Sequence, residues 1–169
     1  MVLGGLAFNA CSTQKDKFIN RNWHALNTEF NTLYNGNLAF QQGLEEINAN
    51  YRDDYWEILP VERLKVTDEI KLDSEDNNPN FLIAEEKATK AIQKHSMDIK
   101  DEERNPQIDE AFLLLGKSRY FDQRYIPALE SFNYILRKYS KSDGLNQATI
   151  WREKRSEERR VGKECPLLC

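Results

Sequence analysis

The 169-residue chain has few of the residues that cross-link or punctuate a fold: three cysteines, seven glycines and five prolines. The cysteines lie at positions 11, 165 and 169, so the body of the chain has neither a disulfide framework nor a zinc knuckle. No apolar run is long enough for a transmembrane helix. The 24 basic residues are scattered among 28 acidic ones, so no basic face is set aside for nucleic acid. The composition favours a water-soluble helical protein that does not bind nucleic acid.

Residues that carry catalysis are equally sparse. His24 and His95 are the only histidines, and their apolar neighbours favour packed or surface positions on helices. The cysteines have no histidine nearby in sequence, and there is no glycine-rich phosphate loop. The acidic clusters at 73–76 and 98–103 lack the alternating Asp/Asn and Gly of an EF-hand and indicate solvated linkers. We therefore expect no catalytic residues, no metal site, no cofactor and no small-molecule substrate.

Apolar spacing and capping residues predict four or five helices. We expect Asn35-Gly36 to end a first helix and to join it to a second one as a hairpin. Asn78-Pro79 and Asn105-Pro106 each offer an N-cap followed by proline at the first helical position. The expected ranges are 20–34, 38–51, 79–95, 106–121, 123–139 (its regular part starting near residue 125) and a last helix from about 145. A short helix at 61–70 and an apolar knot at 55–60 that caps the first hairpin are also predicted.

The stretch from residue 112 to 132 has the spacing of a tetratricopeptide repeat. Small residues, Gly116 and Ala128, stand where two helices of one repeat cross closely, and larger ones fill the volume around the crossing. The predicted repeat-packing residues are Phe112, Leu115, Gly116, Tyr125, Ala128 and Phe132. The motif departs from the consensus at Arg119, where Tyr is usual, and at Ser140, which replaces the closing proline.

The fold prediction is therefore all-α, with tetratricopeptide-like helical hairpins that form a short right-handed solenoid. The earlier units match more loosely, and a plain helical bundle is the alternative. In such repeats the first helix lines the concave face, here at Glu110, Leu113, Lys117, Tyr120 and Phe121. We predict that Lys117 meets an acidic group while Tyr120 and Phe121 clasp an extended or helical peptide. The alternative is that these residues contact the next repeat or solvent.

The N-terminus has the pattern of a bacterial lipoprotein signal. Residues 1–10 are apolar and small, Cys11 follows, and the chain then turns polar. Phe8-Asn9-Ala10-Cys11 is similar to a lipobox, although Phe8 and Asn9 are unusual in it. We interpret 1–10 as a partial signal peptide whose start lies upstream, and Cys11 as the lipidation site. A frayed apolar terminus with an incidental cysteine is the alternative.

The C-terminal stretch from Arg155 to Cys165 resembles the in-frame translation of a sequencing adapter, and four more residues follow it. We therefore interpret 155–169 as a non-native tail and 11–154 as the truncated helical region. The natural protein is expected to continue beyond Lys154. A native helical tail is the alternative.

Three segments resemble one family of envelope proteins: residues 20–37 (NRNWHALNTEFNTLYNGN), 54–60 (DYWEILP) and 146–152 (NQATIWR). Together they are similar to the N-terminal part of the SprE/PorW family of tetratricopeptide outer-membrane lipoproteins, over about residues 8–154. The resemblance implies a non-enzymatic scaffold in type IX protein secretion and gliding motility in Bacteroidetes. It implies protein subunits of that envelope complex as partners, and a lipid anchor at Cys11, most simply on the periplasmic face of the outer membrane.

Two other functions remain open at this point. A SusD-like nutrient-binding lipoprotein also carries tetratricopeptide helices, but it would need exposed aromatic side chains that form a sugar platform. The wide spacing of Trp23, Trp56 and Trp151 favours core anchors instead. A generic tetratricopeptide factor of envelope assembly is the other alternative.

Overall fold

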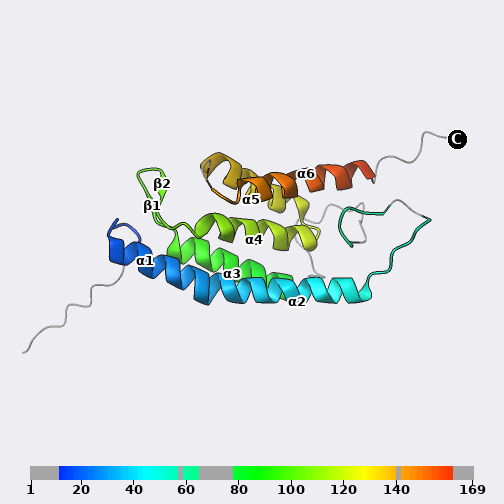
Figure 1. The fold of residues 1–169 in the computed structure, drawn as a ribbon, viewed down its shortest axis with the longest axis horizontal. Coiled ribbons are helices and arrows are strands. Elements are labelled where there is room, and N and C mark those ends of the chain that lie inside the picture. The colour runs from blue at the N-terminus through cyan, green and yellow to red at the C-terminus, as the bar shows by residue number, and fades with distance from the viewer. Residues whose placement is uncertain (1–11, 57–58, 65–77, 140–141, 162–169) are drawn as a thin grey trace, which may run out of the picture.

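The computed structural model describes residues 12–56, 59–64, 78–139 and 142–161, and for 155–161 the backbone alone. This part of the chain is all-α apart from one small hairpin, which confirms the predicted class (Figure 1). The elements are α1 (Phe18–Leu26), the π-helix η1 (Asn27–Leu33), α2 (Tyr34–Asn50), α3 (Pro79–His95), β1 (Asp98–Ile99), β2 (Glu102–Glu103), α4 (Ile108–Phe121), α5 (Tyr125–Lys138) and α6 (Leu145–Val161).

The predicted break at Asn35-Gly36 is wrong, because α1, η1 and α2 form one continuous helix. Gly36 is buried, and a Cβ added there would lie 2.8 Å from Leu114 Cδ2 and 3.1 Å from Lys87 Cβ. Asn35 does not turn the chain either, since its side chain donates back to the carbonyl of Asn31 at 2.7 Å. Glycine at this position lets two other helices approach closely and does not end the helix.

The π-helix in the middle of this first helix keeps one side of it facing the core. The buried residues His24, Thr28, Thr32, Gly36 and Phe40 recur at every fourth position. In a pure α-helix of 3.6 residues per turn, such a row would wind steadily around the axis. The wider π turn, with its i to i+5 bonds, offsets that drift. The Thr28 and Thr32 hydroxyls donate to the carbonyls of His24 and Asn27 within the same segment.

Helix α3 begins and ends where the sequence predicts. The Asn78 side chain accepts a hydrogen bond from the backbone N–H of Asn80 at 2.9 Å, and Pro79 takes the first helical position. Asp122, at the end of α4, accepts from the Asn78 backbone N–H at 3.3 Å. This cap therefore also fixes the start of α3 to the turn between α4 and α5.

The charged link after α3 folds as a two-residue β-hairpin. Lys100 and Asp101 both have positive φ, 57° and 62°, as the favoured hairpin turns require. The predicted start of the next helix at Pro106 is two residues early, because α4 begins at Ile108. Asn105 is buried and donates to Thr28 Oγ1 and to the His95 carbonyl, which ties this turn to the first helix and to α3.

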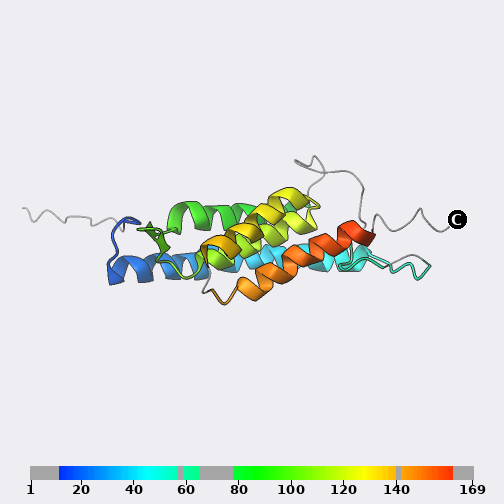
Figure 2. The same ribbon diagram turned by 90° about the horizontal axis from the view of Figure 1, so that it is seen from above.

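Successive helices run antiparallel, and each packs against the next one along the chain (Figure 1). In addition, α4 contacts both α2 and α6, the alternate helices on either side of it in the sequence. Viewed from above, α3 and α6 lie toward opposite sides (Figure 2).

Residues 61–64 are not helical, and the rest of the helix predicted at 61–70 lies outside the described residues, as does part of the apolar knot. Tyr55 and Trp56 of that knot are 79% and 98% exposed, so the prediction that Trp56 anchors the core is wrong, and Trp23, 45% exposed, is not a core residue either.

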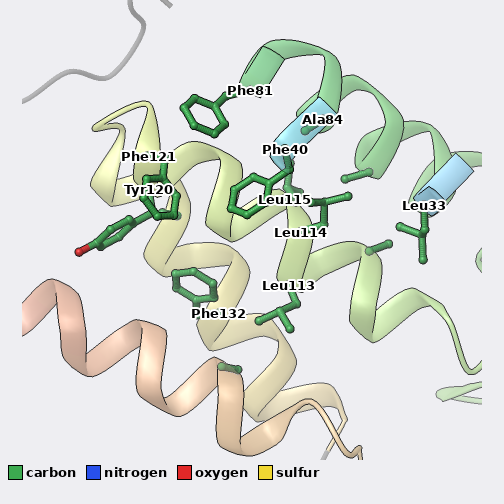
Figure 3. Close-up of a cluster of buried hydrophobic side chains, with 14 of the residues drawn as sticks. Leu33, Phe40, Phe81, Ala84, Leu113, Leu114, Leu115, Tyr120, Phe121 and Phe132 are labelled. Atoms are coloured by element: carbon green, nitrogen blue, oxygen red, sulfur yellow. The ribbon is translucent and has the colours of Figure 1, made fainter. Parts of the chain in front are cut away.

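Aromatic side chains from different helices meet in the core, among leucines and alanines (Figure 3). Phe40 of α2, Phe81 of α3 and Phe121 of α4 form a triangle with ring centroids 5.5–5.7 Å apart. Trp151 of α6 packs edge-on against Tyr120 and Phe121. Such pairs add to the stability from apolar burial, so one connected aromatic cluster joins the first helix to the last.

Candidate protein-binding groove

A groove of about 980 Å³ runs along the face formed by α2, α4 and α6. Phe40, Leu113 and Leu114 lie beneath it as part of the core, each no more than 6% exposed. The turn before α4 and the turn after α5 close its end. Residues of α2 and α4 make up most of its helical lining, to which α5 adds Lys138 and α6 adds Gln147.

The groove is predominantly acidic. Its lining residues include the carboxylates Asp101, Glu102, Glu103, Asp109, Glu110 and Asp143, against the two lysines Lys117 and Lys138. Lys138 is already engaged, since its Nζ lies 2.8 Å from Asp98 Oδ2. Lys117 Nζ lies 3.3 Å from Gln147 Oε1 and 5.6 Å from the centre of the Trp151 ring. An approaching segment therefore meets a surplus of negative charge.

Burial shifts the two charged groups at the centre of the groove toward their neutral forms. Partial burial raises the pKa of Glu110, and the neighbouring Asp109 raises it further. Burial also lowers the pKa of Lys117, while the attraction of Glu110 opposes that shift. Both groups pay for incomplete solvation here, and a ligand of opposite charge would offset part of that cost.

The loop after α5 is held to the start of α4 by a small polar network. The Ser142 hydroxyl donates to the Asp109 carboxylate and accepts from the Gly144 backbone N–H at 2.8 Å. Burial, followed by the nearby Glu103 carboxylate, strongly raises the pKa of Tyr139 at the same end of the groove. This end is therefore built from fixed side chains before any partner arrives.

The predicted groove residues divide into two groups. Glu110, Leu113 and Lys117 do line the groove. Tyr120 is 0% exposed and Phe121 only 7%, because both pack against Trp151 of α6. They accordingly contact the next helix, the alternative weighed from the sequence, and have almost no surface to offer a peptide.

The predicted repeat-packing residues all belong to the core or pack against it. Gly116 of α4 lies against the ring of Phe132 of α5, where an added Cβ would come 2.4 Å from Cε1. The side chain that the glycine accommodates is thus Phe132. Phe112 is half-buried, with its ring 4.3 Å from that of Tyr134, while Tyr125 packs edge-on against Tyr120.

Sequence reasoning missed a half-buried ionic cluster between α3, α4 and the turn into α5. Arg119 Nε donates to Glu85 Oε1 at 2.8 Å, and Arg124 pairs with the same carboxylate. Arg124 also lies 3.2 Å from Asp122. The signal was present at Arg119, which departs from the tetratricopeptide consensus, but its partner lies 34 residues away. These arginines lower the pKa of Glu85 against the opposing effect of its burial.

The proposed lipid anchor and the non-native C-terminal tail lie outside the part of the chain just described. Cys11 and residues 1–10 are outside the described residues, as are residues 162–169 and the side chains of 155–161. Among the residues that the structure does describe, no three His, Cys, Asp or Glu side chains are grouped as a metal site would require. In the same part of the chain, no helix combines the length and the apolar character needed to cross a membrane.

Comparison with known proteins adds no family: no protein-family model matches the chain, and no curated protein is significantly similar to it. The groove and the packing of the helices are therefore the observations that bear on function.

Proposed function

We propose that this chain is a tetratricopeptide-like scaffold that holds a segment of another protein in the groove between α2, α4 and α6. The observation that carries the proposal is that α2, α4 and α6 all contribute residues to one groove. A ligand lying across several helices can be contacted by side chains from each of them, and repeat proteins use such concave surfaces for binding.

The packing of neighbouring helices supports the solenoid part of this proposal. Helices α2 and α3 form one antiparallel pair and α4 and α5 a second, with α6 stacked on the second pair. Glycine occurs at the close contacts of both pairs: Gly43 of α2 lies against Phe81 of α3, and Gly116 of α4 against Phe132 of α5. Glycine–phenylalanine contacts thus recur in successive pairs, although Gly43 and Phe81 are 38 residues apart in the sequence and Gly116 and Phe132 are 16 apart.

The charge of the groove favours a cationic segment. Its carboxylates can pair with lysine or arginine, while Phe40, Leu113 and Leu114, each no more than 6% exposed, offer little apolar contact. Lys117 would meet an acidic or carbonyl oxygen of the bound segment. A basic peptide or protein terminus fits this combination better than a sugar, because Trp151 lies in the aromatic cluster of the core and not on an open platform.

The biological setting that we propose is type IX secretion and gliding motility, with the chain anchored to the outer membrane through Cys11. This part follows from the resemblance of residues 20–37, 54–60 and 146–152 to the SprE/PorW family. A scaffold without catalytic chemistry agrees with that role. The partners would then be other subunits of the envelope complex that present a basic segment to the groove.

Selection of displayed peptides on the whole chain tests the groove. We expect enriched sequences to be basic and to lose at least about tenfold in affinity to the Glu110→Lys variant, since one charge-pair reversal is worth more than about 1.4 kcal/mol in a partly desolvated site. Glu86→Lys on the exposed side of α3 makes the same charge change outside the groove and should bind normally. Equal loss in both variants, or peptides without basic residues, would refute the assignment.

Gene deletion in the parent bacterium tests the biological setting separately. Loss of the protein should abolish both the export of type IX substrates and spreading on soft surfaces. Cys11→Ala should release the protein from the membrane fraction. Normal export in the deletion strain would rule out the secretion role and leave the groove result unaffected.

A further inference from the structure

The first helix has a second apolar face that points away from the core. Residues Ile19, Trp23, Leu26, Phe30, Tyr34 and Leu38, here called the outer stripe, are between 45% and 73% exposed. They follow one another at intervals of three or four residues along α1, η1 and α2. This helix forms one long edge of the molecule in Figure 1, with α3 and α4 packed against its other side.

The outer stripe and the buried row run in parallel between His24 and Phe40. The buried row recurs at every fourth residue from His24 to Phe40, and Leu26, Phe30, Tyr34 and Leu38 recur at the same interval two residues further on. An offset of two residues places the second row on roughly the opposite side of the helix. The π segment, which keeps the buried row facing the core, therefore keeps the outer stripe straight as well. A helix that is apolar on both sides is one that becomes covered on both sides.

The surroundings of the outer stripe are almost free of charge. In the segment from Asn22 to Leu44, which contains five of the six stripe residues, the single charged residue is Glu29, in a chain in which 31% of residues are charged; Lys17 and Arg21 flank Ile19 at the N-terminal end of the stripe. Asparagine and glutamine flank the stripe instead, among them Asn31, Asn35 and Gln42, all exposed. Depletion of charge around exposed aromatic side chains is the composition of the centre of a protein–protein interface.

We propose that the outer stripe is a two-fold interface at which two copies of this chain pair through their first helices. A symmetric interface requires a surface that complements itself, and a neutral stripe can meet its own copy without repulsion between like charges. The residues at intervals of four form a continuous ridge of the kind that packs into the grooves of a facing helix. Phe30, in the middle of the stripe, then lies near the two-fold axis.

The available area is sufficient for such a dimer. Six large, half-exposed side chains present on the order of 100–150 Å² each, or roughly 600–900 Å² together. Stable interfaces bury about 800 Å² on each partner. A membrane surface is a poorer match, because interfacial helices carry lysine or arginine along their apolar face, whereas here Lys17 and Arg21 lie only at the end of the stripe and the segment from Asn22 to Leu44 has neither residue type. The dimer is independent of what the groove binds.

Sedimentation equilibrium of the whole chain in reducing buffer tests the proposal without interference from disulfides. The expected mass is twice 19.8 kDa at tens of micromolar. Phe30→Glu should weaken association at least about a hundredfold, because it buries an unpaired carboxylate at the axis. Ile83→Glu is the matched control: Ile83 on α3 is also a half-exposed apolar residue, and this variant should remain dimeric.

Mixing variants makes the test specific for the geometry. Equal amounts of Phe30→Glu and Phe30→Lys should restore a dimer that neither forms alone. Far-UV circular dichroism checks that each variant is folded. If a charge at position 30 disturbs the helix, the neutral variant Leu26→Ser/Leu38→Ser tests the loss of association by the same sedimentation measurement. A monomeric parent chain, a Phe30→Glu variant that associates like the parent, or a monomer that floats with phosphatidylethanolamine/phosphatidylglycerol vesicles would each overturn the proposal.

Discussion

Gly116→Ala examines the contact between α4 and α5 most directly. The new Cβ would lie 2.4 Å from Phe132 Cε1 and 2.8 Å from both Cδ1 and Cζ. Phe132 is fully buried, and its ring stacks against Trp151 with 21° between the planes. The ring cannot turn aside without disturbing the aromatic cluster, so the helices themselves must move apart.

Two opposing effects determine how much Gly116→Ala changes the free energy of unfolding. Alanine is favoured over glycine inside a helix by about 1 kcal/mol. Forcing an extra methyl group into a packed core costs roughly 1–3 kcal/mol, and contacts this short place the cost near the upper end. We expect a net loss of about 1–2 kcal/mol in the free energy of unfolding. In a chain of this size, that lowers the melting temperature by about 2–8 °C.

Urea unfolding followed by circular dichroism measures this loss, and a second substitution isolates its cause. Phe132→Leu in the Gly116→Ala background makes room for the methyl group, so the double variant should lose less than the sum of the single variants. Gly36→Ala serves as a comparison, because its closest contact is a movable methyl of Leu114, and it should cost less. A Gly116→Ala protein as stable as the parent would refute the close contact.

Three further predictions concern stability. Glu85→Gln should cost roughly 3 kcal/mol in urea unfolding, because two half-buried arginines lose their shared carboxylate, whereas the exposed neighbour Glu86→Gln should be neutral. Tyr120→Ala should cost about 3–5 kcal/mol, as truncation of a fully buried aromatic side chain does; a variant of normal stability would mean that the ring is not part of the core. Burial lowers the pKa values of His24 and His95 below 6.5, so their neutral forms contribute stability above pH 6.5 that is lost as the pH falls toward the folded-state values. The urea midpoint should therefore drop between pH 7 and 5.5, and the His24→Gln/His95→Gln variant should show a flatter profile.

Features set by local chemistry could be predicted from the sequence. The bounds of α3 follow from the Asn78 cap and Pro79, which act within a few residues of the chain. The end of α4 at Phe121 and the start of α5 at Tyr125 were also predicted. Glu110, Leu113 and Lys117 reach the groove because the helical period places them on one side of α4. Periodicity and caps need no knowledge of the other helices.

Features set by contacts between distant segments could not be predicted from the sequence. Asn105 resembles Asn78 in sequence, yet it is buried and bonds to Thr28 across 77 residues, and α4 starts later. Tyr120 and Phe121 occupy positions that face a groove in an isolated hairpin, but Trp151 of α6 covers them. The choice between a core and a groove position depended on how closely the following helix packs, and nothing within α4 specifies that distance.

The glycines show why the local interpretation of Gly36 as the end of a helix fails. Gly36, Gly43 and Gly116 all lie inside helices, and no glycine in the described part of the chain has positive φ. Each instead faces a bulky side chain of another helix: Leu114, Phe81 and Phe132 respectively. Glycine inside a helix costs about 1 kcal/mol relative to alanine, a cost that close approach between helices offsets through burial of aromatic rings. In this helical chain, an isolated glycine within an apolar period therefore indicates a helix crossing before it indicates a turn.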